Sequence, residues 1–194
     1  MKRSVVIALT VLVCTSMLVS SCATSGYKVI DKSGKKESWV KSSEVCYQDK
    51  QMMSCRGEIS NVYDLALGKR QAEADAKKRM VEKVRSDLTI EYKDFVRGAN
   101  AFPGDVGHFV EDILQSTSEV TLSGLTVWKS YWQRESDEEG SKPYYHIYAL
   151  VQLSKKDYEN AKSQIVDALM ERVKQDRNKE AEQLLDEWKK QRGE

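Results

Sequence analysis

The 194-residue sequence has few of the residues from which metal centres, proline-rich ligands and nucleic-acid-binding surfaces are built. Its two histidines and two prolines leave little material for a histidine-rich metal site or a proline-rich recognition segment. Lys and Arg number 31 and Asp and Glu number 30, so no excess of positive charge favours nucleic acid as a partner. Hydrophobic residues make up 40% of the chain, which is enough to bury a core, and we therefore expect a folded protein.

The common catalytic signatures are also missing. There is no Gly-x-Ser-x-Gly elbow, no glycine-rich phosphate loop ending in Lys-Ser or Lys-Thr, and no His-Glu-x-x-His motif. His146 in a predicted strand and His108 in or near a predicted helix are expected to be packed or surface residues. Asp137, Glu138 and Glu139 are expected to form a solvated acidic loop, because EF-hand spacing is absent. We predict no enzyme activity, no metal and no cofactor.

The N-terminus has the pattern of a bacterial export signal that ends in a cysteine. Lys2 and Arg3 precede an apolar run over 5–19, which as a helix would rise about 22 Å and fall short of the roughly 30 Å hydrocarbon core. Val19-Ser20-Ser21-Cys22 then resembles a lipobox, in which Cys22 is diacylated, for example with palmitate, and becomes the mature N-terminus. We predict a cleaved signal peptide over 1–21, and an ordinary signal peptide that contains a cysteine is the alternative.

Acylation of Cys22 would hold the protein at a bilayer surface, since two acyl chains give stable attachment where one is marginal. Ala23 follows the cysteine in place of Asp, which favours the bacterial outer membrane, on its periplasmic face or at the cell surface. Residues 22–43 are rich in Ser, Lys, Gly and Thr, and we predict that they form a flexible tether. Trp39 in this segment is expected either to dock on the domain edge or to stay partly exposed.

Cys46 and Cys55 form an even pair in a chain that is predicted to be exported. The polar residues between them can turn, so 44–47 and 52–58 are expected to be the arms of a hairpin joined by a disulfide. For so short a loop the stabilisation would be about 2–3 kcal/mol. Two buried free thiols and a zinc half-site are the alternatives, although neither histidine is close to this pair in the sequence.

Hydrophobic periodicity predicts the remaining elements. Apolar residues recur every four positions from Ala72 to Leu88, which indicates a helix over about 63–87, and the alternation of Leu88, Ile90 and Tyr92 predicts a strand after it. A second helix is expected over 106–117. Strands are expected over 119–134, with a bulge at Ser123-Gly124, and over 144–153. The last strand has apolar residues on both phases, so we predict that it is central in the sheet.

The final predicted helix starts at Ser154, which with Asp157 forms a variant of the capping box. No residue over 174–180 is apolar, and a second apolar patch of Leu184, Leu185 and Trp188 follows. Unbroken to residue 190, the helix would be about 55 Å long, more than a domain of this size can cover. We predict that its end projects or turns, and that the patch packs on its own domain, on a second copy or on another envelope protein.

Aromatic residues gather on the last two predicted strands: Trp128, Tyr131, Trp132, Tyr144, Tyr145 and Tyr148. Cross-strand aromatic pairs stabilise sheets, and this accounts for most of the cluster. Trp128 and Trp132 share one strand phase, however. If that face is open, these two residues, with Tyr144 and Tyr148, are candidates for binding a glycan or a protein partner.

Three segments carry a family resemblance: Ser54-Cys55-Arg56-Gly57-Glu58, Leu122-Ser123-Gly124-Leu125-Thr126-Val127-Trp128 and Tyr148-Ala149-Leu150-Val151. In this order, and with the lipobox, the chain over about 39–165 resembles the LPP-twenty lipoprotein family, which is related to flagellar outer-membrane lipoproteins of the FlgP type. The resemblance implies a small α+β, dodecin-like domain in an envelope protein without an assigned activity. Two departures are that Trp39 lacks the proline that often precedes the family's tryptophan, and that the charged tail beyond about 175 is longer.

The sequence thus predicts an α+β fold in which one main helix packs on an antiparallel sheet. We expect a single domain over 44–175 and a charged C-terminal helical extension over 176–194. The expected function is that of a membrane-anchored, non-catalytic structural or protein-binding module, either a homo-oligomer or part of an outer-membrane or flagellar assembly. The alternative is a module that binds a glycan, peptidoglycan or a small hydrophobic ligand on an aromatic sheet face.

Overall fold

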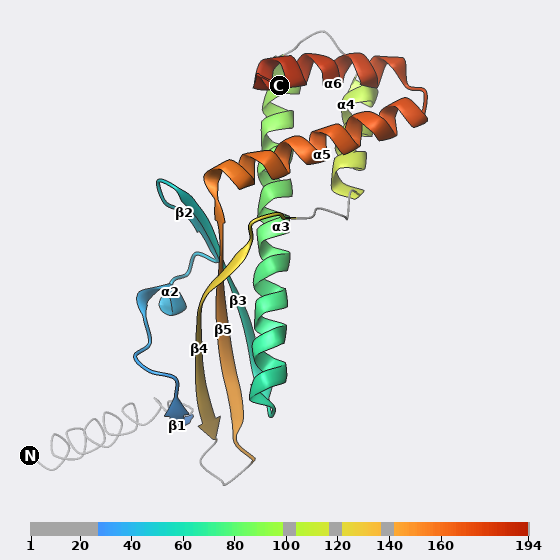
Figure 1. The fold of residues 1–194 in the computed structure, drawn as a ribbon. Coiled ribbons are helices and arrows are strands. Elements are labelled where there is room, and N and C mark those ends of the chain that lie inside the picture. Colours follow the sequence, from blue (N-terminus) through green and yellow to red (C-terminus); the bar gives the residue numbers. More distant parts are fainter. Residues whose placement is uncertain (1–26, 99–103, 117–121, 137–141, 194) are drawn as a thin grey trace, which may run out of the picture.

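The computed structural model describes residues 27–98, 104–116, 122–136 and 142–193, which form one antiparallel sheet with helices around it (Figure 1). The strands are β1 (Lys28–Lys32), β2 (Cys46–Gln48), β3 (Met52–Val62), β4 (Thr126–Ser136) and β5 (Tyr144–Ser154). The helices are α2 (Ser38–Lys41), α3 (Leu65–Gly98), α4 (Gly104–Ser116), α5 (Lys155–Gln175) and α6 (Lys179–Arg192). The predicted α+β fold is confirmed, and the dodecin-like comparison stays a prediction.

The strand order is β1-β4-β5-β3-β2, and every neighbouring pair is antiparallel. β5 is therefore central, as its apolar residues on both phases predicted. We call the side of the sheet covered by α3 the helix face, and the opposite side the outer face. Ile147 and Ala149 of β5 belong to the main core under α3, whereas Tyr148 and Leu150 belong to a smaller cluster on the outer face.

Helix α3 is longer than predicted, and the strand expected at 88–92 is wrong. Leu88 and Tyr92 are buried and continue the stripe that recurs every four residues, while Ile90 is 55% exposed. Three alternating apolar residues fit either period, and here the helical stripe continues because α4, α5 and α6 surround the second half of α3 (Figure 1). One helix therefore serves both the sheet and a helical head made of α4, α5, α6 and the end of α3.

The first half of α3 lies directly on β3. A Cβ atom at Gly57 would lie 2.1 Å from the carbonyl oxygen of Ala72 and 2.2 Å from the backbone nitrogen of Ala76. Both alanines are fully buried. Glycine opposite two alanines allows this approach of helix and strand, because no side chain separates the two backbones.

The chain turns back after α5, which is one of the two predicted courses, so residues 176–193 do not project from the fold. Ser154 caps α5 by accepting a hydrogen bond from the Asp157 backbone N–H at 3.1 Å, as predicted. Arg177 adopts a left-handed conformation with φ of 56°, and Asn178 then caps α6. This sharp turn folds α6 against α4 and α5.

The start of β4 also differs from the prediction. Ser123 and Gly124 form a turn before the strand, with φ of 81° at Gly124. The strand begins at Thr126, and its bulge falls between Val127 and Lys129. The predicted strand residues 119–121 lie outside the described part of the chain.

The described part of the segment predicted as a tether, residues 27–43, contains a strand and a short helix. β1 pairs with the end of β4, and all five of its side chains are exposed. Trp39 and Val40 of α2 are buried on the outer face. β1 is held by backbone hydrogen bonds and its side chains are exposed, so it has no alternating hydrophobic pattern that would predict a strand. The polar composition of this segment therefore favoured a flexible tether.

Candidate functional site

The outer face of the sheet is partly covered by α2. Trp39 and Val40 pack there with Tyr131, Tyr148 and Leu150. The rings of Tyr131 and Tyr148 have centroids 6.2 Å apart, and both residues are buried. Of the two locations expected for Trp39, the structure shows the docked one, and this part of the aromatic cluster is not an open surface.

The side chain of Arg56 binds the backbone at the end of α2 and holds this helix on the sheet. Its Nη1 atom donates to the carbonyl oxygens of Trp39 at 2.9 Å, Val40 at 3.0 Å and Ser42 at 2.7 Å. The side chain comes from β3 and is almost completely buried. A buried guanidinium is tolerated only when hydrogen-bonded, and three carbonyl groups at the end of a helix meet that need.

His146 contacts a carboxylate on the outer face. Its Nε2 lies 3.0 Å from Oε1 of Glu58, and its ring stacks on Tyr148 at 4.6 Å. Burial raises the pKa of Tyr148 to about 12; the negative charge of Glu58 adds to this shift and Arg56 opposes it. The phenol is therefore protonated at neutral pH, so it cannot supply a phenolate nucleophile there.

The predicted aromatic cluster does not form one surface, because strand neighbours point to opposite faces of the sheet. Trp132 is half-buried on the helix face, where it meets Tyr145 edge-on with ring centroids 5.6 Å apart. Tyr144 lies at the end of the sheet, 6.4 Å from the ring of Tyr27. Trp128 alone among the predicted binding aromatics is largely open, at 59% exposure.

Trp128 lies on a part of β4 that forms a sheet edge. β1 pairs only with residues 133–136 of β4, and Ser33 extends the contact to Trp132 through its backbone N–H and its hydroxyl. Within the described residues, the first half of β4 has no strand on this side. Val127 beside it is 42% exposed. A sheet edge with open hydrogen-bonding capacity is a surface to which a strand of another protein can add, and an exposed tryptophan beside it offers an apolar contact.

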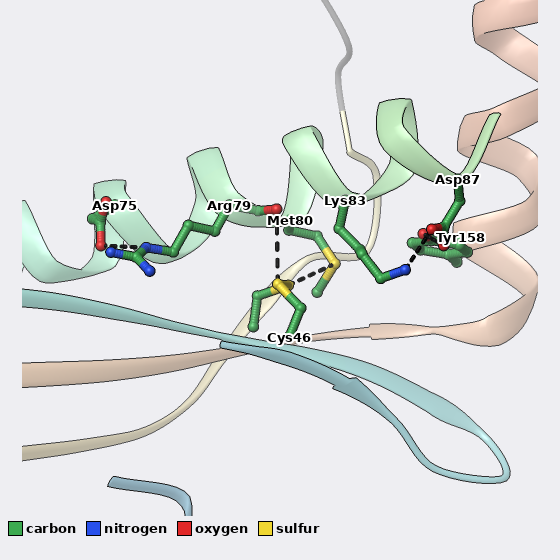
Figure 2. Close-up of a disulfide and its surroundings, with 8 residues drawn as sticks. Cys46, Asp75, Arg79, Met80, Lys83, Asp87 and Tyr158 are labelled. Atoms are coloured by element: carbon green, nitrogen blue, oxygen red, sulfur yellow. Dashed lines mark hydrogen bonds and ion pairs between the residues drawn. A yellow bond between two sulfur atoms is a disulfide. The ribbon is translucent and has the colours of Figure 1, made fainter. Parts of the chain in front are cut away.

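The predicted disulfide is present in the structure. Cys46 and Cys55 lie directly opposite each other on β2 and β3, and their sulfur atoms are 2.02 Å apart. Cys55 is fully buried, with its sulfur 3.8 Å from the sulfur of Met80. Figure 2 shows this bond beneath α3, on which Arg79 pairs with Asp75 at 2.8 Å.

A groove of about 510 Å³ lies beside the disulfide, between β2 and α3. Its charged wall includes Lys78, Glu82 and Lys83. Lys83 pairs with Asp87, which also accepts a hydrogen bond from the hydroxyl of Tyr158 at 2.6 Å (Figure 2). These side chains form ion pairs with one another along α3. Asp87 also accepts a hydrogen bond from α5, so the group connects the two helices.

The C-terminal patch is covered by its own chain. Leu184 and Leu185 are fully buried, and Trp188 is buried against Tyr92, with ring centroids 5.1 Å apart. Of the three predicted locations for this patch, the structure shows the intramolecular one. These three residues are therefore not a free binding surface.

Glu91 joins the three long helices of the head. Its two carboxylate oxygens accept from Lys162 of α5 and Arg192 of α6. Lys162 is buried and also lies 5.2 Å from the ring centroid of Tyr158. The carboxylate thus satisfies a buried ammonium group and fixes α6 to α3 at the same point.

Sequence reasoning missed Arg56, Gly57 and Glu91. A lone arginine or glutamate in an amphipathic element resembles any solvated residue, so no local signal separates Arg56 or Glu91 from exposed charges. Gly57 carried a weak signal, since a glycine inside a strand pattern can mark close approach of another backbone.

Several predicted residues lie outside the described part of the chain, among them Cys22 and the acidic residues Asp137, Glu138 and Glu139. In the part that is described, no helix is both long and apolar enough to cross a bilayer. The same residues include no group of three or more His, Cys, Asp or Glu side chains that could hold a metal ion.

Searches against protein-family models, curated proteins and solved structures find no match to this chain.

Proposed function

We propose that the chain is a lipid-anchored protein of the bacterial envelope that acts as a non-catalytic, protein-binding module. The observation that carries this proposal is Val19-Ser20-Ser21-Cys22 at the end of a short apolar run. The disulfide between Cys46 and Cys55 supports it, because disulfides persist in oxidising compartments such as the bacterial periplasm.

The surface best suited to a partner protein is the open half of β4, with Val127 and Trp128 exposed beside it. An extended segment of another chain could add to this edge through main-chain hydrogen bonds, while Trp128 would supply an apolar contact. The bulge after Val127 makes the edge irregular, which limits indiscriminate pairing. The partner is either a second copy or another envelope protein, such as a component of an outer-membrane or flagellar assembly.

The alternative, a glycan or small hydrophobic ligand on an aromatic sheet face, has less support. Such a ligand needs an open aromatic platform. Tyr148 is buried, and Trp132 and Tyr144 are only partly exposed. Trp128 is then the principal ring for a ligand to contact.

The anchor is tested by growing cells with a labelled fatty acid and recovering the chain. We expect label in the wild type and in Cys14→Ser, whose cysteine lies in the predicted signal peptide, and no label in Cys22→Ser. Label that persists in Cys22→Ser, or its absence from the wild type, would contradict the proposal.

The protein-binding role is tested by cross-linking in intact cells followed by mass spectrometry. We expect Trp128→Ser to lose cross-linked partners that Ile90→Ser retains, since both residues are exposed and Ile90 lies on α3 away from the β4 edge. A monomer without partners in the wild type would reject this role and direct glycan and lipid screens to Trp128.

A further inference from the structure

One end of the sheet brings five elements together. Lys28 at the start of β1 pairs with Ser136 at the end of β4, and Val62 at the end of β3 pairs with Tyr145 near the start of β5. Helix α3 begins three residues after Val62. In Figure 1 this end lies opposite the head of α4, α5 and α6. We call it the sheet end and define it by Tyr27, Lys28, Tyr63, Leu67, Lys142 and Tyr144.

Exposed apolar side chains concentrate at and beside the sheet end. Eight large hydrophobic residues are exposed among the described residues, and five of them belong to this end or to β1: Tyr27, Val29, Ile30, Tyr63 and Leu67. Tyr27 and Tyr63 are the most exposed of these five, at 60% and 57%. Exposed apolar side chains that lie in one region mark that region as a contact surface, because contact with another surface removes them from water.

The chemistry of the sheet end matches a membrane–water interface. Tyr27 packs edge-on to Tyr144, and Lys142 places its ammonium group 4.6 Å from the ring centroid of Tyr63. Tyrosine rings favour the headgroup level of a bilayer, and lysine keeps its charge in water while its stem lies along apolar surface. The end thus combines apolar rings with charges that can remain hydrated.

The charges at this end are mixed. Lys28 and Lys142 are accompanied by Asp64 and Glu135, and the sequence between β4 and β5 contains three more acidic residues. A cluster of this kind has no excess of positive charge to attract anionic lipids. The matching surface is one of zwitterionic phospholipids.

The chain between Cys22 and Tyr27 is short, so a membrane that holds acylated Cys22 would lie near the sheet end. Tyr27 is five residues after Cys22, and five extended residues span at most about 17 Å. β1 then fixes Tyr27 to the fold through its pairing with β4. The rest of the segment predicted as a tether adds no reach before the sheet end, because it follows Tyr27 and contains β1 and α2.

We propose that the sheet end rests on a zwitterionic bilayer surface, with Tyr27 and Tyr63 at the headgroup level and the helical head pointing away from the membrane. This rests on the proposed acylation of Cys22. It places the exposed Trp128 away from the lipid, because β4 runs from Thr126 toward the sheet end at Ser136.

The test uses the full acylated protein in phosphatidylcholine vesicles, with a spin label at Tyr63→Cys or, as the matched control, at Lys179→Cys in the head. Collision of each label with oxygen and with a water-soluble nickel chelate reports its depth. We expect a several-fold lower ratio of chelate to oxygen collisions at 63 than at 179. A second label at Leu67→Cys should behave like the label at 63.

Equal chelate access at 63, 67 and 179 in vesicle-bound protein would overturn the contact while leaving the anchor intact. Protein without acyl label that stays out of the vesicle fraction would overturn both this proposal and the anchor. Protection at 63 that appears only when anionic lipid is added would overturn the zwitterionic surface.

Discussion

At the scale of single residues, Arg56 shows how one side chain organises a neighbouring segment. Its guanidinium is buried and bonds to three carbonyl groups of the chain around α2. Helix α2 has only four residues, too few to be stable alone. Its position on the outer face therefore depends on Arg56 and on the burial of Trp39 and Val40.

We predict that Arg56→Met lowers the free energy of unfolding by about 1–3 kcal/mol, because buried carbonyl groups lose their charged donor. Urea unfolding measures this change, and limited proteolysis is expected to cut the segment around α2 earlier. The control is Arg70→Met at an exposed position on α3, where little change is expected. Equal stability of the two variants would show that Arg56 does not hold α2.

Buried tyrosines make the stability sensitive to alkaline pH. Burial raises the pKa of Tyr148 to about 12, and it also raises the pKa of Tyr158, whose hydrogen bond to Asp87 adds to the shift. An unfolded tyrosine has a pKa of about 10. Above that pH the unfolded chain loses protons that the folded chain keeps, so stability is full below pH 10 and falls as the pH rises toward 12.

We expect the free energy of unfolding to fall between about pH 10 and 12, by about 1.4 kcal/mol per pH unit for each fully shifted tyrosine. Tyr148→Phe should reduce this slope, because phenylalanine has no proton to lose. The comparison is with Tyr27→Phe at an exposed position, measured by urea unfolding across the same pH range. An identical slope in both variants would remove Tyr148 as a cause.

At the scale of elements, the contact between α3 and β3 depends on the absence of a side chain. Gly57 approaches the backbone of α3 at Ala72 and Ala76, and backbone atoms cannot move aside as a flexible side chain can. The sequence signal for this contact is the small size of both alanines in the helical stripe. Gly57 itself carried only a weak signal, and the structure identifies the two alanines as the residues it meets.

We predict that Gly57→Ala destabilises the protein by about 3 kcal/mol or more, at the upper end of the cost of overpacking a core. Gly98→Ala is the matched control, because a Cβ atom at Gly98 meets nothing within 4 Å. Thermal unfolding followed by circular dichroism compares the two. A Gly57→Ala protein as stable as Gly98→Ala would mean that the helix and strand can separate at little cost.

At the scale of the whole molecule, α3 joins the sheet to the helical head. Its first half packs on the helix face and its second half packs with α4, α5 and α6. Glu91 and the pair formed by Tyr92 and Trp188 fix α6 to the far part of this helix. Loss of packing in the head should therefore be transmitted to the sheet.

We predict that Trp188→Ala lowers the free energy of unfolding by about 3–5 kcal/mol, as expected for a large buried aromatic side chain. Far-ultraviolet circular dichroism and reactivity of the disulfide to reductant should report one coincident transition, because both halves share α3. Trp128→Ala is the control and should change stability by less than about 0.5 kcal/mol, since its side chain is largely exposed. Two separate transitions would show that the head unfolds independently.

The sequence by itself determined the features that depend on local patterns. The four-residue stripe from Ala72 set α3 on the sheet, apolar residues on both phases made β5 central, and the spacing of Cys46 and Cys55 predicted the paired hairpin. These follow from side-chain periodicity and from the short reach between neighbouring elements.

The tertiary structure alone decided how distant segments are used. It continued α3 through Tyr92, because the head offered a buried environment, and it folded Leu184, Leu185 and Trp188 inward instead of leaving them for a partner. It also made β1 part of the sheet through backbone hydrogen bonds, which no side-chain pattern encodes. Which surface remains open, at Trp128 and at the sheet end, depends on these long-range contacts, and local sequence patterns do not specify it.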